Sequence, residues 1–255
     1  MRLTVRRTGV SAARMSRMHA LLDPAKPLAV GSFGNAKSLA EARAEELRDA
    51  CDLVELRLDL LEAEGVLTSS RPWSHLSGLP LLFTARRGDE GGAGDFSPDQ
   101  RRSMLSRILE EATLVDLELA SADAMAGLLE NLRERGLPWV ASWHDFEGRA
   151  DSFDRIPAMA EEAAEAGAAC FKAAIRLHSA SDLARLAELL KTVDVLPLSL
   201  MGMGPLAPVS RLLCAQYGSV LNYGYIGDAP TAPGQWSARQ LKSAIQALEP
   251  LARRR

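Results

Sequence analysis

Lys172 is the side chain of this sequence whose surroundings best suit covalent chemistry. It lies in the middle of the apolar segment 168–175 (AACFKAAI), which Gly167 precedes and a polar run follows, a pattern typical of a buried strand. An ammonium group in such a place is costly unless it is paired or loses its proton. A desolvated, neutral amine is the nucleophile that Schiff-base formation on a carbonyl requires. The simpler alternative is a lysine at a strand end that reaches solvent.

His144 is the candidate for proton transfer, because an imidazole ring titrates near neutrality. It ends an apolar segment, in the run Ser142-Trp-His-Asp-Phe146, whereas the other histidines lie in the N-terminal segment, in an irregular link or beyond the lysine segment. A histidine alone is more often structural. One that shares a cavity with a buried lysine is expected to take part in the chemistry.

Short apolar segments alternate with amphipathic helical stretches from Pro27 onward, and the pattern recurs eight times. Such alternation with short links predicts parallel strands joined by right-handed crossovers. Eight units in about 225 residues predict an α/β fold, an eight-stranded parallel (β/α)8 TIM barrel in a single domain. An open, doubly wound sheet is the alternative, although no Gly-x-Gly-x-x-Gly follows the first strand. The predicted strands are 28–33, 53–59, 80–86, 114–119, 138–144, 168–175, 195–201 and 220–225.

Charged and apolar residues alternate along several of these strands, so that one face of each strand is charged. In an antiparallel sheet the charged face would meet solvent. In a barrel the helices cover the outside, and we therefore expect the charged face to line the interior. Buried charges are tolerable there only if they pair with one another or with a polar ligand. The acids predicted inside are Glu55, Asp59, Asp116 and Glu118, and the bases are Arg57, Arg86 and Lys172.

Two segments after the last strands add candidate binding groups. Met203-Gly follows the seventh strand and Ser210-Arg211 opens the next helix, where a guanidinium suits a planar carboxylate. The loop 227–235 (GDAPTAPGQ) follows the eighth strand, and its glycines and prolines are typical of a turn-rich segment that could close over a ligand with Gln235.

Composition excludes several classes of function. The net charge of −3 and the pI near 5.9 favour neither nucleic acid nor an anionic membrane as partner. No apolar run approaches the roughly 20 residues that span a bilayer. The three cysteines are widely spaced and form no metal-type pair, which favours a reducing cytoplasm and no metal site.

The first 26 residues differ from the rest of the chain, because they carry five arginines and no acid before Asp23. They lack the apolar core of a signal peptide. We expect a poorly ordered basic extension over 1–26 and the catalytic barrel over 27–255. An organelle-targeting leader is the alternative.

Taken together, these residues resemble the type I, Schiff-base-forming 3-dehydroquinate dehydratases of the shikimate pathway. The resemblance runs from about Pro27 to about Gln240 and rests on seven short motifs in order along the chain. The motifs are Glu55-Leu-Arg57-x-Asp59, Phe83-Thr-x-Arg86-x-x-x-Glu90-Gly-Gly92, Asp116-x-Glu118, Ser142-x-His144-Asp145-Phe146, Lys172-x-Ala174, Met203-Gly with Ser210-Arg211, and Ala232-Pro-Gly-Gln235.

The resemblance implies a role for each candidate. Lys172 would form an imine with the substrate ketone, and His144, oriented by Glu90, would take a proton from the adjacent carbon and help expel a hydroxyl as water. The product would be 3-dehydroshikimate, formed without a metal or organic cofactor, and family members are often homodimers. The implied substrate-binding residues are Arg211 and Gln235 for the carboxylate, Glu55, Arg57 and Arg86 for the ring hydroxyls and charge, and Met203, Tyr223 and Thr231 around them, with Asp59, Asp116 and Glu118 as a supporting charge network.

Three residues depart from the family pattern. Ala207 replaces a glycine, Tyr223 a phenylalanine and Thr231 a serine, changes that bear on rate and on the fit of the last loop. Two other functions remain open: a class I aldolase-type barrel, which needs no carboxylate clamp by Arg211 and Gln235, and a non-catalytic ligand sensor on the same fold.

Overall fold

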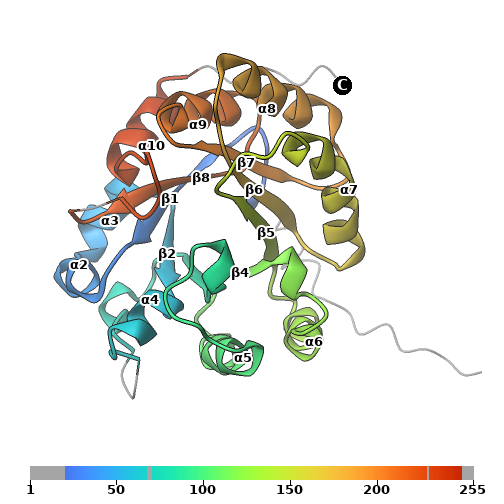
Figure 1. Cartoon of the computed structure of the whole chain (residues 1–255). Helices are drawn as coiled ribbons and strands as arrows, with labels where there is room; N and C mark the ends of the chain where they lie inside the picture. Colours follow the sequence, from blue (N-terminus) through green and yellow to red (C-terminus); the bar gives the residue numbers. More distant parts are fainter. Residues whose placement is uncertain (1–20, 68–70, 229, 249–255) are drawn as a thin grey trace, which may run out of the picture.

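Eight parallel strands form a nearly closed barrel with helices around it, as predicted (Figure 1). The computed structural model describes residues 21–67, 71–228 and 230–248. The strands are β1 (Leu28–Phe33), β2 (Leu53–Arg57), β3 (Leu81–Thr84), β4 (Leu114–Glu118), β5 (Trp139–Asp145), β6 (Cys170–Arg176), β7 (Leu198–Met203) and β8 (Leu221–Ile226). The helices are α2 (Ala36–Glu41), α3 (Ala44–Ala50), α4 (Leu58–Ala63), α5 (Pro98–Ser106), α6 (Ala126–Arg135), α7 (Ser152–Glu165), α8 (Ala180–Thr192), α9 (Ala207–Gln216) and α10 (Ala238–Gln246), with short 3₁₀ turns at Ser74–Leu76, Gly88–Glu90 and Leu119–Ser121.

The strands follow one another around the barrel in the order β7-β6-β5-β4-β3-β2-β1-β8. At the seam between β7 and β8, the Val220 amide donates to the Leu198 carbonyl at 2.9 Å and the Ser199 hydroxyl donates to the Leu221 carbonyl at 2.6 Å. These contacts bring the last strand back to its neighbour, so the carboxyl ends of all eight strands surround one opening.

The alternation of the strands places apolar side chains on the outside, against the helices. Leu56, Phe83 and Leu117 lie in this outer core and are fully buried. The inward positions are apolar near the amino ends of the strands, where Leu53 and Leu114 belong to a second core. They are polar farther along the same strands, so the barrel has an apolar base and a charged upper interior.

Residues 21–26 belong to the span predicted as a basic extension. Leu22 is buried against the apolar base of the barrel, in one cluster with Val30 and Leu53. The remainder of that span, residues 1–20, lies outside the described residues. Across the part of the chain that is described, no helix is long and apolar enough to cross a membrane.

The second strand is shorter than predicted. Helix α4 begins at Leu58, so Asp59 lies in the first turn of a helix and not on the strand predicted over 53–59. An acidic side chain is favourable in a first helical turn, where the backbone N–H groups have no helical partner. Asp59 is nevertheless fully buried, as the predicted charge network requires.

Candidate active site

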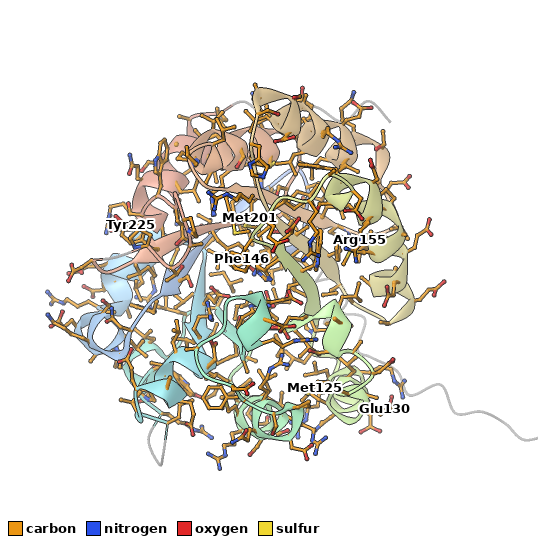
Figure 2. All side chains as sticks on the ribbon, in the orientation of Figure 1. Met125, Glu130, Phe146, Arg155, Met201 and Tyr225 are labelled. Carbon is orange, nitrogen blue, oxygen red and sulfur yellow. The ribbon has the colours of Figure 1, made fainter. Side chains whose placement is uncertain are left out.

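A cavity of about 110 Å³ lies inside the barrel at the carboxyl ends of the strands. Figure 2 labels Phe146 and Met201 over the centre of the barrel, and both line this cavity. All predicted catalytic and substrate-binding residues line it as well: Glu55, Arg57, Arg86, Glu90, His144, Lys172, Met203, Arg211, Tyr223, Thr231 and Gln235. A larger cavity of about 380 Å³, which Trp73 and Met104 help to line, contains none of these residues.

Lys172 lies in the middle of β6, and its side chain is buried inside the barrel. Its Nζ donates to Asp116 Oδ2 at 2.8 Å and lies 4.1 Å from the centroid of the Tyr223 ring. Ser142 on β5 and Ser199 on β7 are its neighbours in register, and these small side chains leave room beside the amine. The lysine is therefore buried and paired, and it does not reach solvent.

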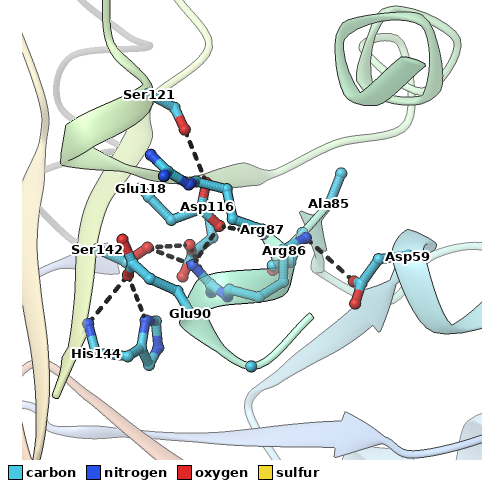
Figure 3. Close-up of polar contacts among 12 residues, drawn as sticks. Asp59, Ala85, Arg86, Arg87, Glu90, Asp116, Glu118, Ser121, Ser142 and His144 are labelled. Carbon is cyan, nitrogen blue, oxygen red and sulfur yellow. Dashed lines mark hydrogen bonds and ion pairs between the residues drawn. The ribbon is translucent and has the colours of Figure 1, made fainter. Parts of the chain in front are cut away.

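His144, near the end of β5, is paired with Glu90. Both the backbone N–H and the ring Nδ1 of His144 lie 3.0 Å from Glu90 Oε2, so a single carboxylate oxygen orients the ring (Figure 3). Burial, with Arg86 and Lys172 nearby, lowers the pKa of His144 well below its usual value. The ring is therefore neutral near pH 7. When Glu90 is ionised it accepts a hydrogen bond from Nδ1–H, and the Nε2 lone pair is then available as a base.

Glu90 is held in the 3₁₀ turn Gly88–Glu90, and it is the group of this pair that titrates near neutrality. Burial and the charge of Glu118 raise the pKa of Glu90 to about 7, although Arg86 opposes the rise. The geometry of the His144 pair consequently depends on the protonation of Glu90.

Arg86 is the centre of a buried polar network (Figure 3). Its Nη1 donates to Glu118 Oε1 at 2.9 Å and to Ser142 Oγ at 2.6 Å, and its Nη2 donates to Asp116 Oδ1 at 2.8 Å. Burial alone would lower the pKa of Arg86, but the two carboxylates raise it above its usual value. Burial likewise opposes ionisation of Asp116, but Arg86 and Lys172 outweigh it and hold the pKa of Asp116 below its usual range.

Asp59 fixes the loop that carries Arg86 and Glu90. It accepts two bonds from Arg57, at 2.8 and 2.6 Å, and further bonds from the backbone amides of Arg86 and Ala93. The loop turns tightly at Gly92, where a Cβ would lie 2.3 Å from the Arg86 carbonyl oxygen. Glycine is thus required at this position, and the turn holds Arg57 and Arg86 at the rim of the cavity.

Glu55 is the acid that faces the cavity from β2. It is buried and accepts hydrogen bonds from the Ser32 and Thr84 hydroxyls on the two neighbouring strands. These two hydrogen bonds fix the orientation of its carboxyl group at the cavity wall.

Arg211, in α9, is buried and has no counter-ion among the residues that the structure describes. Its Nη1 donates to the Tyr223 carbonyl at 2.6 Å, its contact with Met201 Sδ is a weak one at 4.0 Å, and its Nε has no partner among the described residues. Burial lowers the pKa of Arg211 to about 10, although Cys214 acts in the opposite direction. A guanidinium in this state has unused capacity for an anion.

The loop after β8 brings Gln235 to the same side of the cavity. Gln235 Oε1 accepts from the Thr231 amide at 2.9 Å and from the Thr231 hydroxyl at 2.8 Å, so the loop is braced internally. Gly234 adopts a positive φ of 74°, and a Cβ there would lie 2.1 Å from the Gly204 carbonyl oxygen. The loop can therefore pack against the end of β7 and close one side of the opening.

Arg101 is a functional candidate that the sequence did not reveal. From α5 it donates to Glu118, to the Ser121 hydroxyl at 3.1 Å and to the Ala85 carbonyl at 2.7 Å. Glu118 is thereby held between Arg101 and Arg86. The neighbouring Arg102 is exposed and pairs with Asp99 on the surface, and no sequence signal separates the two arginines.

Among the side chains that the structure describes, no group of three or more His, Cys, Asp or Glu residues is arranged to hold a metal ion. The cavity presents a buried amine, an imidazole held by a carboxylate and an unpaired guanidinium. Such a set suits imine formation and proton transfer on a small carbonyl compound that carries an anionic group.

Comparison with known proteins agrees with this chemistry. A family model described as type I 3-dehydroquinase matches residues 33–252. A 3-dehydroquinate dehydratase from Methanothrix thermoacetophila is 36% identical over 222 residues, which cover 87% of this chain and 92% of the relative. The crystal structure of 3-dehydroquinate dehydratase from Geobacillus kaustophilus superposes with a TM-score of 0.74 at 25% identity, covering 86% and 90% of the two chains. The structure of 3-dehydroquinate dehydratase from Enterococcus faecalis superposes with a TM-score of 0.73 at 25% identity, covering 88% of this chain and 95% of that one.

Proposed function

The chain belongs to the type I 3-dehydroquinase family, and we propose that it performs the family reaction through an imine on Lys172. It is a hydro-lyase of the shikimate pathway that converts 3-dehydroquinate into 3-dehydroshikimate and water. One observation supports the proposal most: a buried amine, a base and an unpaired guanidinium line one cavity of about 110 Å³. The roles below follow from the contacts of each side chain.

Lys172 is the nucleophile. The ammonium gives up one proton, and the neutral nitrogen then attacks the ketone carbon and forms the C–N bond. The nitrogen loses a second proton after the attack, and both protons leave with the carbonyl oxygen as water, which gives a protonated imine. The positive imine withdraws electrons from the adjacent carbon, so a neutral imidazole is basic enough to remove a proton there. The ion pair with Asp116, at 2.8 Å, holds the nitrogen inside the cavity before the attack.

His144 moves the proton. Its Nε2 takes the proton from the carbon next to the imine, and the electron pair forms an enamine. The enamine then expels the hydroxyl group, which leaves as water with the proton that His144 carries. Hydrolysis of the remaining imine releases the product and restores Lys172. Glu90 supports these steps because its Oε2, 3.0 Å from Nδ1, keeps the ring in one tautomer.

Arg211 and Gln235 bind the substrate carboxylate. The guanidinium has no counter-ion among the described residues, so a carboxylate would compensate its charge with two hydrogen bonds. Thr231 and Met203 complete this side. On the opposite side Glu55, Arg57 and Arg86 face the ring hydroxyls. The supporting network of Asp59, Asp116 and Glu118 holds the two arginines in place.

Borohydride reduction in the presence of 3-dehydroquinate tests the mechanism. Peptide mass mapping should place the added mass on Lys172, and Lys172→Ala should remove both the adduct and the activity. His144→Ala should still form the adduct while turning over about 10²–10⁴-fold more slowly, the usual contribution of a positioned acid–base group.

Lys191→Ala is the matched control, because this lysine is exposed on α8 and pairs with Glu188 at the surface. It should label and turn over like the unmodified protein. Mass on a lysine other than Lys172, or normal turnover by His144→Ala, would remove the corresponding role. A sensor would not dehydrate the substrate at all.

The assembly and location are further parts of the proposal. The family resemblance supports a homodimer, which light scattering on the purified chain would detect as twice the mass of 27.5 kDa. The three cysteines are free and buried, as suits a reducing cytoplasm. We also propose that the barrel over 27–255 forms one catalytic domain. A chain that begins at residue 21, and so keeps Leu22, should retain full activity.

A further inference from the structure

The aromatic face of Tyr223 lies directly beside the nitrogen that the proposed mechanism uses. Lys172 Nζ is 4.1 Å from the ring centroid, well inside the range of a cation–π contact. Both side chains are buried, Tyr223 with 4% of its surface exposed, and both line the cavity. Such contacts are strongest where water is excluded, as it is here.

The resting lysine and the imine differ in what they need from their surroundings. An ammonium has three N–H donors, one of which Asp116 receives at 2.8 Å. After imine formation the nitrogen keeps a single N–H and becomes part of a planar cation, whose two faces cannot be hydrogen-bonded. An aromatic face can cover a planar cation, as it does for guanidinium groups. The ring therefore stabilises the imine more than it stabilises the ammonium.

We propose that the ring of Tyr223 is the platform on which the protonated imine of Lys172 lies, and that Tyr223 is thus a further catalytic residue. This inference rests on the proposed function. The ring fixes the plane of the imine as well as its charge, and so directs the adjacent carbon toward the base of His144.

Tyr223 is itself held firmly. It lies in β8, and its backbone carbonyl accepts the 2.6 Å bond from Arg211 Nη1. Its ring packs in the inner apolar cluster with Met201 and Met203. One residue thereby connects the amine that forms the imine with the guanidinium proposed to hold the carboxylate.

The ring, and not the hydroxyl, carries the proposed role. The Tyr223 hydroxyl oxygen is buried and has no hydrogen-bond partner among the residues the structure describes. Tyr223→Phe keeps the aromatic face and removes only this oxygen. It is therefore the reference protein with which the fluorinated rings below are compared.

Fluorinated phenylalanines at position 223 test the ring directly. Each added fluorine withdraws charge from the ring face while its shape changes little. The rate of borohydride trapping on Lys172 should fall in steps through the mono-, di- and trifluoro rings, by about tenfold in total, as expected for a desolvated cation–π contact. KM should rise by a larger factor than kcat falls. The ring stabilises the protonated imine, and the positive charge of this imine is lost when the enamine forms.

The same series at Phe83 is the matched control, since that buried ring packs against Trp73 in the outer core at 5.2 Å between centroids. Fluorination there should leave trapping unchanged. Tyr223→Leu, which removes the ring, should match or exceed the loss of the trifluoro ring. Equal trapping across the series at 223 would overturn the inference. Absence of any Lys172 adduct in the unmodified protein would instead overturn the proposed function.

Discussion

Two buried arginines face the same cavity from opposite sides and differ in their electrostatic surroundings. Arg86 follows β3 and has carboxylates at 2.8 and 2.9 Å, and its pKa lies above its usual value because these charges outweigh burial. Arg211, in α9, has one backbone carbonyl and no acid among its described neighbours, and burial lowers its pKa to about 10. Each side chain is at most 3% exposed, so burial alone does not separate them.

This difference separates a charge that stabilises the fold from a charge that is available to bind a ligand. The charge of Arg86 is compensated by acids of the protein itself, and one of them, Glu118, pairs with both Arg86 and Arg101. The Arg211 side bears a desolvation cost that only an added anion offsets. We therefore expect loss of Arg86 to cost stability and loss of Arg211 to cost substrate binding.

The largest expected effect is on the compensated side. Arg86→Met leaves Asp116 and Glu118 short of a buried partner, and should lower the free energy of unfolding by roughly 3–5 kcal/mol. Urea unfolding followed by circular dichroism measures this change. Arg102→Met is the control, since its pair with Asp99 is exposed, and it should cost about 1 kcal/mol or less. Equal losses for the two variants would show that the network does not stabilise the fold.

The uncompensated side should respond in binding. Arg211→Met should raise KM about 10²-fold, because the carboxylate loses charge-assisted hydrogen bonds worth roughly 1.5–3 kcal/mol each. The KM of Arg211→Lys should lie between that of the unmodified protein and that of Arg211→Met, because an ammonium carries the charge but cannot form a two-pronged contact. Stability of Arg211→Met should stay within about 1 kcal/mol of the unmodified protein, or exceed it, because an unpaired buried charge is gone.

Arg239→Met serves as the control for that experiment, because Arg239 lies exposed on α10 and donates to the Glu46 carbonyl at 3.1 Å. Neither KM nor stability should change. If Arg211→Met instead unfolded as readily as Arg86→Met with KM unchanged, the two arginines would be equivalent and the comparison would be broken.

The smallest expected effect is a pH dependence of kcat/KM that arises on the Arg86 side of the cavity. Glu90 lies on the acid-rich side, where burial and Glu118 raise its pKa to about 7. Below that pH its carboxyl is protonated and holds His144 Nδ1–H less well, so kcat/KM should fall as pH drops through about 7. This fall is the acidic limb of the pH profile, and His144 cannot cause it, because burial puts the pKa of His144 well below 6.5. Glu90→Gln should lower activity and remove the limb, whereas Glu165→Gln, on an exposed part of α7, should keep it.

Much of the fold was predictable from local pattern. Strand periodicity put Asp116 and Glu118 on one face, and the helices between strands assigned that face to the interior. In the structure Leu114 lies in the apolar base of the barrel, on the strand that carries these two acids. Strand ends were less predictable: Asp59 continues the alternation of β2 in sequence but lies in α4, because a helix start accommodates an acid as readily as a strand does.

The sequence by itself determined that this chain would bury charges in a barrel interior with Lys172 and His144 among them, because side-chain alternation depends only on neighbouring residues. It also indicated the family, through motifs in a fixed order. Only the tertiary structure decided which charge meets which. Arg101 reaches Glu118 from a helix, whereas Arg211 meets no acid within the described part of the chain, although both are arginines in helices. Partnership depends on distances between segments remote in the chain, and no local pattern encodes those distances.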